Sequence, residues 1–217
     1  CEAGDHAACR VRAARLLTGV VLVRDVPAAV ALLRRDCRRH GRGGSVVSCF
    51  RLGALHEAGH GVSRDLPRAL ALFAVACDAG HGEACTRRAR IWLPPITGPG
   101  PGVEGEILQA LMIDQGLEDA PDQSWRTEHE EPEPSDTVLD GWLSRGCDLG
   151  DAVGCRLAAR RSADAEPQAA LYERGCRLGD ATSCAELAEL APAGADVHAL
   201  REQACRAGAP TCEARPR

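Results

Sequence analysis

Residues 49–85, CFRLGALHEAGHGVSRDLPRALALFAVACDAGHGEAC, decide the fold of this chain. The stretch contains two apolar segments of helical length, separated by a glycine-rich turn. Asp65 is a natural helix N-cap and Pro67 suits a first helical turn, so we expect a helix to start there. Gly80, three residues after Cys77, is typical of the left-handed residue that ends a helix. The stretch therefore predicts two helices bounded by tight turns.

The other cysteines repeat the spacing of this turn. The chain has 12 cysteines, which form six couples, and four of these couples are separated by seven residues. A chain that turns back between two helices brings the paired Cβ atoms within bonding range, so we expect a disulfide in each couple. Zinc binding or a reduced state is an alternative, although structural zinc sites favour two to four residues between paired cysteines. The expected disulfides are Cys1–Cys9, Cys37–Cys49, Cys77–Cys85, Cys147–Cys155, Cys176–Cys184 and Cys205–Cys212.

The cysteines also bear on localisation. Disulfides imply an oxidising compartment, so we expect a periplasmic or secreted protein. The sequence has no run of 18 apolar residues and predicts no transmembrane segment. An N-terminal cysteine such as Cys1 is also what a mature bacterial lipoprotein presents. Because lipidation of Cys1 would leave Cys9 without its partner, we favour a chain cut within a repeat over a lipid anchor.

The segments repeat along the chain. Residues 24–37 and 64–77 are identical at seven of 14 positions and lie 40 residues apart. Five residues before the cysteine, Leu32 and Leu72 are expected to face the core. A small residue recurs four positions after each second cysteine, which allows two helices to approach closely. These small residues are Ala13, Gly53, Ala89, Ala159 and Ala188. Repeats of this length predict an all-α solenoid of αα-hairpins, each covered by its neighbour.

Residues 49–85 resemble one complete Sel-like repeat (SLR, tetratricopeptide-related). The elements that carry the resemblance are Leu52-Gly53, the Gly59-x-Gly61-Val62 turn, Asp65, Ala69 and Ala76-Cys77. The paired cysteines resemble those of the cysteine-rich, Hcp-like branch. The resemblance is strong over 9–85 and compressed over 136–212, where the spacing is 29 residues and the glycine turn is missing. It implies a right-handed superhelix that serves as an interaction scaffold, and some Hcp-like proteins bind and weakly hydrolyse β-lactams.

The repeat pattern divides the chain into three parts. We expect N-terminal repeats over 1–92, an irregular joint over 93–135 and short C-terminal repeats over 136–217. Proline and glycine fill 94–105, whereas 106–118 has the apolar spacing of one amphipathic helix. The middle part is either a degenerate repeat or a flexible joint. We favour a joint, because the charge sign and the repeat length both change across it.

A catalytic or metal site is hard to find. The string His56-Glu57-Ala58-Gly59-His60 has the HExxH form of zinc peptidases, but the glycine predicts that the helix ends before His60. The chain contains no Lys and no G-x-S-x-G string, which excludes the standard lysine-dependent and serine-hydrolase motifs. We therefore expect no catalytic residue, no metal and no cofactor. A β-lactam-binding protein with weak hydrolase activity is the alternative, without a residue to nominate.

Charge is uneven along the chain. Residues 1–90 contain 15 Arg against 8 acidic residues, whereas the remainder contains 11 against 23. An arginine cluster over 34–42 could hold phosphate, an acidic polysaccharide or the acidic segment 128–136, but a solvated helix end is the simpler interpretation. Only six aromatic residues occur, too few for base stacking, so we expect no nucleic-acid partner.

The sequence thus predicts a monomeric, non-enzymatic scaffold that binds a protein or a peptide. Helices that follow each second cysteine line the inner surface of tetratricopeptide-like stacks, so the resemblance places partner-binding residues there. The exposed candidates on these helices are Arg10, Arg51, Arg87, Arg156 and Arg160.

Overall fold

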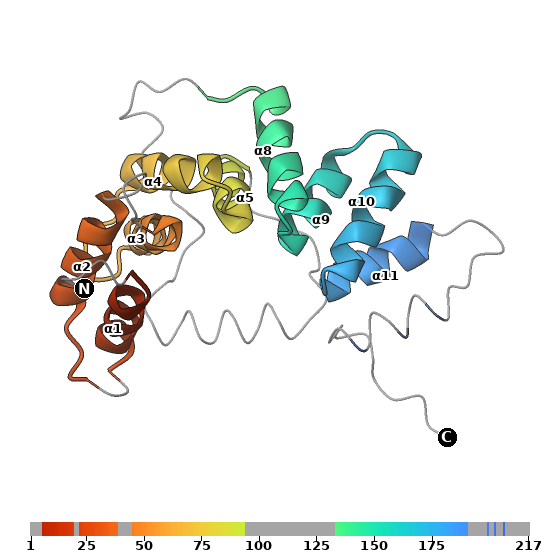
Figure 1. Ribbon diagram of the computed structural model, residues 1–217. Helices are drawn as coiled ribbons and strands as arrows, with labels where there is room; N and C mark the ends of the chain where they lie inside the picture. Colours follow the sequence, from red (N-terminus) through yellow and green to blue (C-terminus); the bar gives the residue numbers. More distant parts are fainter. Residues whose placement is uncertain are drawn as a thin grey trace. The chain divides into compact units, whose positions relative to one another are not determined.

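The computed structural model describes residues 6–19, 22–38, 45–93 and 133–190, together with Ala199, Glu202 and Arg206. The helices within these ranges fall into two compact units, which we describe separately (Figure 1). The first unit contains α1 (His6–Thr18), α2 (Val26–Arg38), α3 (Val46–Ala58), α4 (Leu66–Asp78) and α5 (Gly82–Arg90). The second contains α8 (Asp136–Asp148), α9 (Ala152–Arg161), α10 (Ala165–Arg177) and α11 (Ala181–Leu190).

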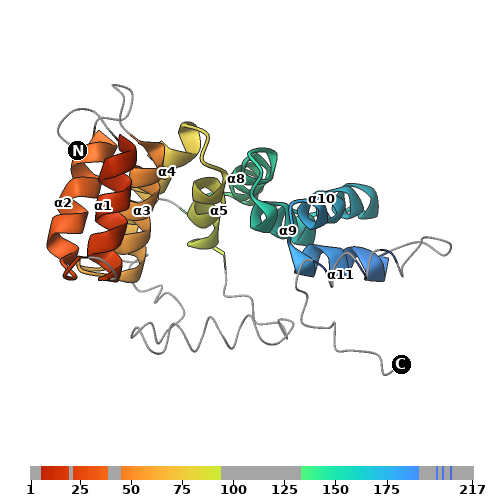
Figure 2. The ribbon, with the colours of Figure 1, turned by 60° about the horizontal axis from the view of Figure 1, so that its bottom comes forward.

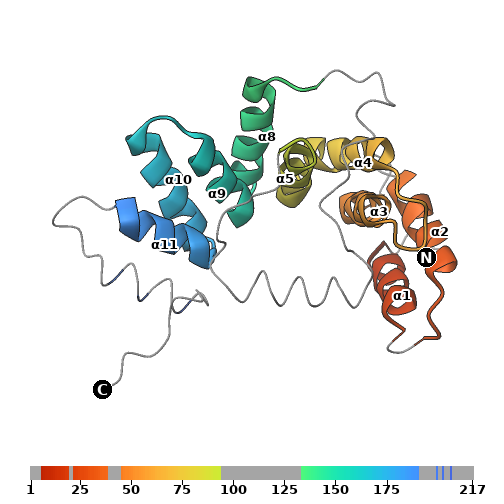
Figure 3. The same ribbon diagram turned by 180° about the vertical axis from the view of Figure 1, so that it is seen from behind.

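Within each unit, every helix packs against the helices before and after it in sequence. The first unit continues in this way from α1 to α5, as Figure 2 shows, and the second from α8 to α11 (Figure 3). The expected all-α fold of sequential hairpins is therefore confirmed. The right-handed superhelix, the division at 92 and 135 and the monomeric state stay predictions. The helix expected over 106–118 lies outside the described residues.

The turn between paired cysteines has the same backbone in three copies. Gly80, Gly150 and Gly179 adopt positive φ angles of 91°, 89° and 94°. In the first of these turns, the Gly80 N–H donates to the Cys77 carbonyl at 3.0 Å and the His81 N–H donates to the Ala76 carbonyl at 2.9 Å. This is the hydrogen-bond pattern by which a left-handed glycine ends a helix. The glycine expected three residues after the cysteine thus reverses the chain.

Disulfides hold the two sides of these turns together. The bonds found among the described residues are Cys37–Cys49, Cys77–Cys85, Cys147–Cys155 and Cys176–Cys184. Their Cα atoms are 4.4 to 4.7 Å apart, within the normal range for a disulfide. The couples Cys1–Cys9 and Cys205–Cys212 include residues outside the described ranges, although Cys9 itself is disulfide-bonded.

The recurrent small residue marks the closest helix contact. A Cβ atom on Gly53 would lie 2.8 Å from the ring of Phe73, so no larger residue fits while the ring stays in place. In the preceding copy the equivalent residues are Ala13 and Leu33, which belong to one buried cluster. Where the facing side chain is leucine rather than phenylalanine, the residue at the closest contact is thus alanine rather than glycine.

The core position was expected one residue too early. Leu32 and Leu72 pack against the core but are only partly buried. The residues that follow them are the deepest, because Leu33 and Phe73 are 1% and 0% exposed. Helix pairs approach through a face centred four residues before the cysteine, opposite the small residue of the preceding helix.

The two units differ in the connection that joins one hairpin to the next. In the first unit, Gly59 has a φ angle of 73° and the Asp65 N–H donates to the His56 carbonyl at 3.0 Å, which closes a long loop. In the second unit, α9 ends at Arg161 and α10 begins at Ala165. The connection is short, as the 29-residue spacing predicts.

Candidate interaction surface

The HExxH string does not form a two-histidine helix face. Helix α3 ends at Ala58, and Gly59 adopts the left-handed conformation that takes the chain off the helix axis. His56 is buried within the helix, whereas His60 follows the turn. Among the described residues, no three His, Cys, Asp or Glu side chains gather closely enough to hold a metal ion.

His56 instead occupies a core position. It is 4% exposed, and neither ring nitrogen has a hydrogen-bond partner. Burial lowers the pKa of His56 below its ordinary value, and the charge of Arg68 acts in the same direction, while the backbone of Ser63 opposes it. Forty residues earlier, the equivalent position is Leu16, which packs against the same cluster. A buried histidine thus stands where the preceding copy has an apolar residue.

The helices that follow each second cysteine, α1, α3 and α5 in the first unit and α9 and α11 in the second, are joined within each unit at a repeated position. The residue immediately after the second cysteine contacts the residue that precedes the next helix of this set. Arg10 donates from Nη1 to Ser45 Oγ at 2.9 Å, before α3. Arg156 Nε lies 3.4 Å from Asp180 Oδ2, before α11.

The third example of this contact is aromatic. Phe50 follows Cys49, and its ring stacks on that of His81 with 4.3 Å between centroids, before α5. Since a cation–carboxylate pair, a hydrogen bond from a guanidinium to a hydroxyl and a ring stack all occur at this position, the contact is defined by geometry rather than by one chemistry. Each contact fixes the start of one helix against its predecessor.

Further arginines reinforce the same helices in the first unit. Arg51 donates to the Arg10 carbonyl at 3.5 Å. Arg87 Nη1 lies 2.9 Å from Glu57 Oε2, its Nε lies 3.2 Å from Glu83 Oε1, and its guanidinium lies 5.4 Å from the centroid of the Phe50 ring. Burial alone would lower the pKa of Arg87, but its two carboxylate partners raise it overall. The guanidinium of Arg87 is therefore held in ion pairs with two carboxylates.

Arg160 plays the corresponding part in the second unit. Its Nε donates to Glu186 Oε1 at 3.0 Å, which joins α9 to α11. The hydrogen bond to Glu186 raises the pKa of Arg160. Tyr172 of α10 lies beneath this pair at 3% exposure, and burial raises the pKa of its hydroxyl.

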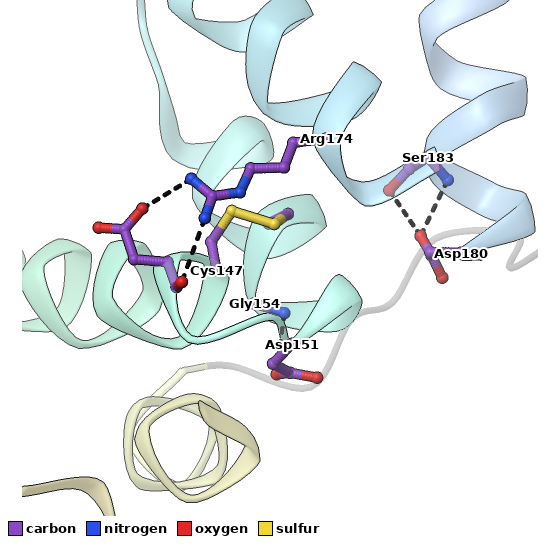
Figure 4. The surroundings of a disulfide bond; sticks show 8 residues. Cys147, Asp151, Gly154, Arg174, Asp180 and Ser183 are labelled. Carbon is purple, nitrogen blue, oxygen red and sulfur yellow. Dashed lines mark hydrogen bonds and ion pairs between the residues drawn. A yellow bond between two sulfur atoms is a disulfide. The ribbon is translucent and has the colours of Figure 1, made fainter. Parts of the chain in front are cut away.

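Other ion pairs that the sequence analysis missed join helices of this unit, one between its two hairpins and the others within the first hairpin. Arg174 of α10 donates to Asp148 Oδ1 at 2.7 Å and to the Asp148 carbonyl at 3.2 Å, beside Cys147 (Figure 4). Arg161 of α9 pairs with Asp136 at 2.7 Å and also with Asp140. Asp151 and Asp180 occupy the same place after their turns, and each caps the helix that follows (Figure 4). This repetition is visible in the sequence.

The five candidate arginines are thus not freely exposed side chains. Each one has an intramolecular partner, and the side chains of Arg87, Arg160 and Arg156 are 34%, 31% and 19% exposed. Apart from Glu83, which lies four residues from Arg87, their partners are 24 to 41 residues away along the chain, beyond the reach of a local pattern. Whether these residues also contact a partner protein stays a proposal.

Comparison with known proteins identifies the repeat. Residues 46–81 match the family model of the Sel1 repeat. The chain contains a Sel1 repeat. The matched repeat begins at α3 and ends just after α4, so it includes Cys49 and Cys77 but not Cys37 and Cys85. In this Sel1-repeat protein the disulfides therefore tie the repeat to a helix on either side, consistent with the Hcp-like branch.

Solved structures show the same fold. A protective antigen from uropathogenic Escherichia coli that displays an SLR fold is 17% identical, with a TM-score of 0.62 over 98% of this chain. A Sel1 repeat protein from Oxalobacter formigenes is 16% identical, with a TM-score of 0.63 over 94% of this chain. The Sel1-repeat chain spans 39% and 74% of the lengths of these two proteins. No match was found among curated proteins.

The structure also bears on the surroundings of this Sel1-repeat protein. Four disulfides among the described residues indicate an oxidising, extracytoplasmic environment. Within the same residues, no helix has both the length and the apolar character needed to cross a membrane.

Proposed function

We propose that this chain is a non-enzymatic, periplasmic or secreted scaffold that binds a protein or a peptide. The binding surface is formed by α1, α3 and α5 in the first unit and by α9 and α11 in the second. The observation that carries the proposal is the repeated contact between successive helices of this set, made by Arg10, Phe50 and Arg156.

This contact supports binding because it fixes the surface before a partner arrives. Within each unit, the residue that precedes a later helix of the set contacts the helix before it in the set, and a disulfide holds the preceding turn. A surface that is ordered in advance loses less conformational entropy on binding. Such preorganisation is what a scaffold requires, and it needs no catalytic group.

The arginines have two roles in this proposal. Arg10, Arg51 and Arg156 position the helices. Arg87 and Arg160 keep about one third of their side chains exposed while paired. Because a guanidinium carries five N–H donors, each can bind a second carboxylate without leaving its first. An acidic partner segment therefore fits this surface.

A charge swap tests this role without removing the internal pair. We compare the wild type with Arg87→Glu/Glu57→Arg, which exchanges the charges of the ion pair, and with Arg68→Glu, an exposed arginine on α4. Photocrosslinkers placed on α5 report the partner captured in a periplasmic extract or culture medium, and thermal unfolding reports the fold. We expect the swap to reduce capture at least fivefold, which corresponds to about 1 kcal/mol. The protein should stay folded with a stability loss below about 1 kcal/mol, because the swap keeps the pair with residue 57 but loses the pair with Glu83.

Two results would contradict this proposal. Equal capture by the swap, the control and the wild type would show that Arg87 does not contact the partner. Turnover of a chromogenic cephalosporin by the oxidised protein, above a reduced control, would favour the hydrolase alternative.

A further inference from the structure

One cysteine of the four described disulfides differs from the others in exposure. Cys37 is half-buried, whereas its partner Cys49 is 0% exposed. The six cysteines of the other three described disulfides are at most 4% exposed. Thiol–disulfide exchange requires that an attacking thiolate reach one of the two sulfur atoms. Of these disulfides, Cys37–Cys49 is therefore the one that a thiol in solution can reach, and it is reached at Cys37.

The exposure of Cys37 accompanies a longer turn. Cys37 and Cys49 are 12 residues apart, whereas the cysteines of the other three disulfides are 8 residues apart. A missing neighbouring helix does not account for the difference. Helix α8 has no described helix before it in its unit, yet Cys147 near its end is only 1% exposed. The accessibility thus belongs to this couple and not to its place near the start of a unit.

The sequence around Cys37 favours the approach of an anion. Residues 34–39 read RRDCRR, and the one carboxylate among them, Asp36, is only 3% exposed. In two other couples, an exposed aspartate directly follows the first cysteine, namely Asp78 and Asp148. Because cations attract and stabilise a thiolate while carboxylates repel it, exchange at Cys37 is favoured by charge as well as by access.

A hydrogen bond joins α2 to α3 beside this disulfide. Ser48 Oγ donates to Asp36 Oδ2, and each residue directly precedes a cysteine of the couple. Both side chains are buried. In each of the other described couples, at least one of these two positions lacks a side chain that can form a hydrogen bond. Their residues are Ala76 and Ala84, Gly146 and Gly154, and Gly175 and Ser183. The α2–α3 turn is therefore the one in which a non-covalent link accompanies the disulfide.

We propose that Cys37 is a site at which a small anionic thiol attaches reversibly. The thiolate attacks Cys37 Sγ and forms a new S–S bond, while the bond from Cys37 Sγ to Cys49 Sγ breaks. Its electron pair goes to Cys49 Sγ, which takes a proton from solvent, so the incoming thiol is oxidised and Cys49 is reduced. Cys49 Sγ lies 3.5 Å from the Cys37 carbonyl oxygen, which can accept a hydrogen bond from the new thiol.

The attachment is reversible because the Cys49 thiolate can attack the mixed disulfide and release the small thiol. The hydrogen bond from Ser48 to Asp36 holds the two helices in place while the disulfide is open. None of the arginines of the proposed binding surface takes part, so either proposal can fail without the other.

The first test measures exchange in the full oxidised chain under native conditions. Glutathione, which carries a net negative charge, is the probe, and cysteamine is the cationic counterpart. Each rate is divided by the rate of the same thiol with the neutral bis(hydroxyethyl) disulfide, which removes the difference in intrinsic reactivity. Acid quenching, N-ethylmaleimide and peptide mass spectrometry after pepsin digestion locate the adduct and the released thiol.

We expect glutathione on Cys37 and N-ethylmaleimide on Cys49. This reaction should be at least about tenfold faster than reaction at Cys77–Cys85, the buried control couple. The normalised rate should be at least about twofold higher for glutathione than for cysteamine, and the difference should shrink as salt rises. Glutathione on Cys49 instead of Cys37, equal rates at the two couples, or a higher normalised rate for cysteamine would overturn the proposal.

The second test asks whether the hydrogen bond substitutes for the open disulfide. Asp36→Ala/Ser48→Ala reproduces the alanine pair of the next couple, and it is made in the wild type and in Cys37→Ala/Cys49→Ala. We expect it to lower the Tm at least about 3 °C more when the disulfide is absent. An equal decrease in both backgrounds, or loss of cooperative unfolding in Cys37→Ala/Cys49→Ala itself, would contradict attachment to the folded protein.

Discussion

Single residues decide how closely the helices of this protein approach, and two of them break the pattern of their own repeat. His56 replaces the Leu16 of the preceding copy at a buried position. Gly53 and Phe73 replace Ala13 and Leu33 at the helix contact. Both changes alter the packing of one copy without altering its backbone. The loops that follow α1 and α3 keep the same backbone hydrogen bond in both copies.

His56 makes the stability of the first unit depend on pH. Burial lowers the pKa of His56 in the folded state, so the unfolded chain binds a proton first as the pH falls. The free energy of unfolding should therefore decrease as the pH falls below about 6.5, the ordinary histidine value. His56→Leu, which restores the residue of the first copy, should remove this dependence. It should also stabilise the neutral protein by on the order of 1 kcal/mol, because an unpaired buried polar group is lost.

Urea unfolding at pH 7.5 and pH 5.5 measures both effects. His60→Gln serves as the matched control, because His60 lies beyond the end of α3 and is only half-buried. A decrease of equal size in the wild type and in His56→Leu would assign the pH dependence to other groups.

Gly53 and Phe73 should be energetically coupled. Gly53→Ala places a methyl group 2.8 Å from the Phe73 ring, which should cost about 1–3 kcal/mol of unfolding free energy. In Gly53→Ala/Phe73→Leu, which reproduces the residue pair of the first copy, the loss should be at least about 0.5 kcal/mol smaller than the sum of the two single losses. A double-mutant cycle by chemical denaturation measures this coupling. Strict additivity would mean that the backbones separate instead.

At the scale of the element, the unit of construction is a helix end, a turn and a helix start held by one disulfide. The glycine reverses the chain, the residue after it caps the new helix, and the cysteines lock the two sides. These interactions are local in sequence, so each clip can form alone. One such unit is joined to the next where the residue that precedes a helix contacts the residue after the second cysteine of an earlier helix.

Asp180 should therefore contribute more to the free energy of unfolding than Asp151 does. Both side chains accept a backbone N–H of the helix they cap, from Ser183 at 2.9 Å and from Gly154 at 3.1 Å. Only Asp180 also pairs with Arg156. Asp151→Ala should cost about 1 kcal/mol of unfolding free energy, and Asp180→Ala about 0.5–1 kcal/mol more.

Denaturant unfolding of the two variants tests this comparison. Asp180→Asn keeps a capping oxygen but removes the charge, so it separates the cap from the ion pair. Equal losses in Asp151→Ala and Asp180→Ala would show that the contact with Arg156 contributes nothing to stability.

At the scale of the whole molecule, stability is the sum of contacts between neighbouring helices, because each helix packs mainly on those next to it in sequence. The described core contains many alanines and few large side chains. Closing each short disulfide loop adds about 2.5 kcal/mol in the chain-entropy model, so four such loops together rival the stability of a typical domain.

Reduction should therefore unfold the protein. We expect dithiothreitol to abolish the cooperative thermal transition that circular dichroism detects in the oxidised protein. The intact mass of the oxidised protein should be lower than that of the reduced protein by two hydrogens for each of six disulfides. Alkylation without reduction should detect no free thiol. Retention of the transition after complete alkylation would show that packing alone holds the helices together.

Much of this arrangement could be predicted from sequence because it depends on neighbours in the chain. The left-handed glycines, the capping aspartates and the paired cysteines act over at most 12 residues, and their positions match the expected turns. The core position was misplaced from Leu33 to Leu32, because the alanine-rich helices show little contrast between adjacent residues. The pairing of Arg87 and Arg160 could not be predicted, because each binds a carboxylate on another helix.

The sequence by itself determined the helices, the turns and the cysteine couples, because short-range backbone preferences and loop closure specify them. Tertiary structure alone decided which side chains are engaged. Ser45 meets Arg10 across 35 residues and Glu186 meets Arg160 across 26. Such pairs form only when successive helices lie side by side, so their existence depends on packing geometry rather than on any local pattern.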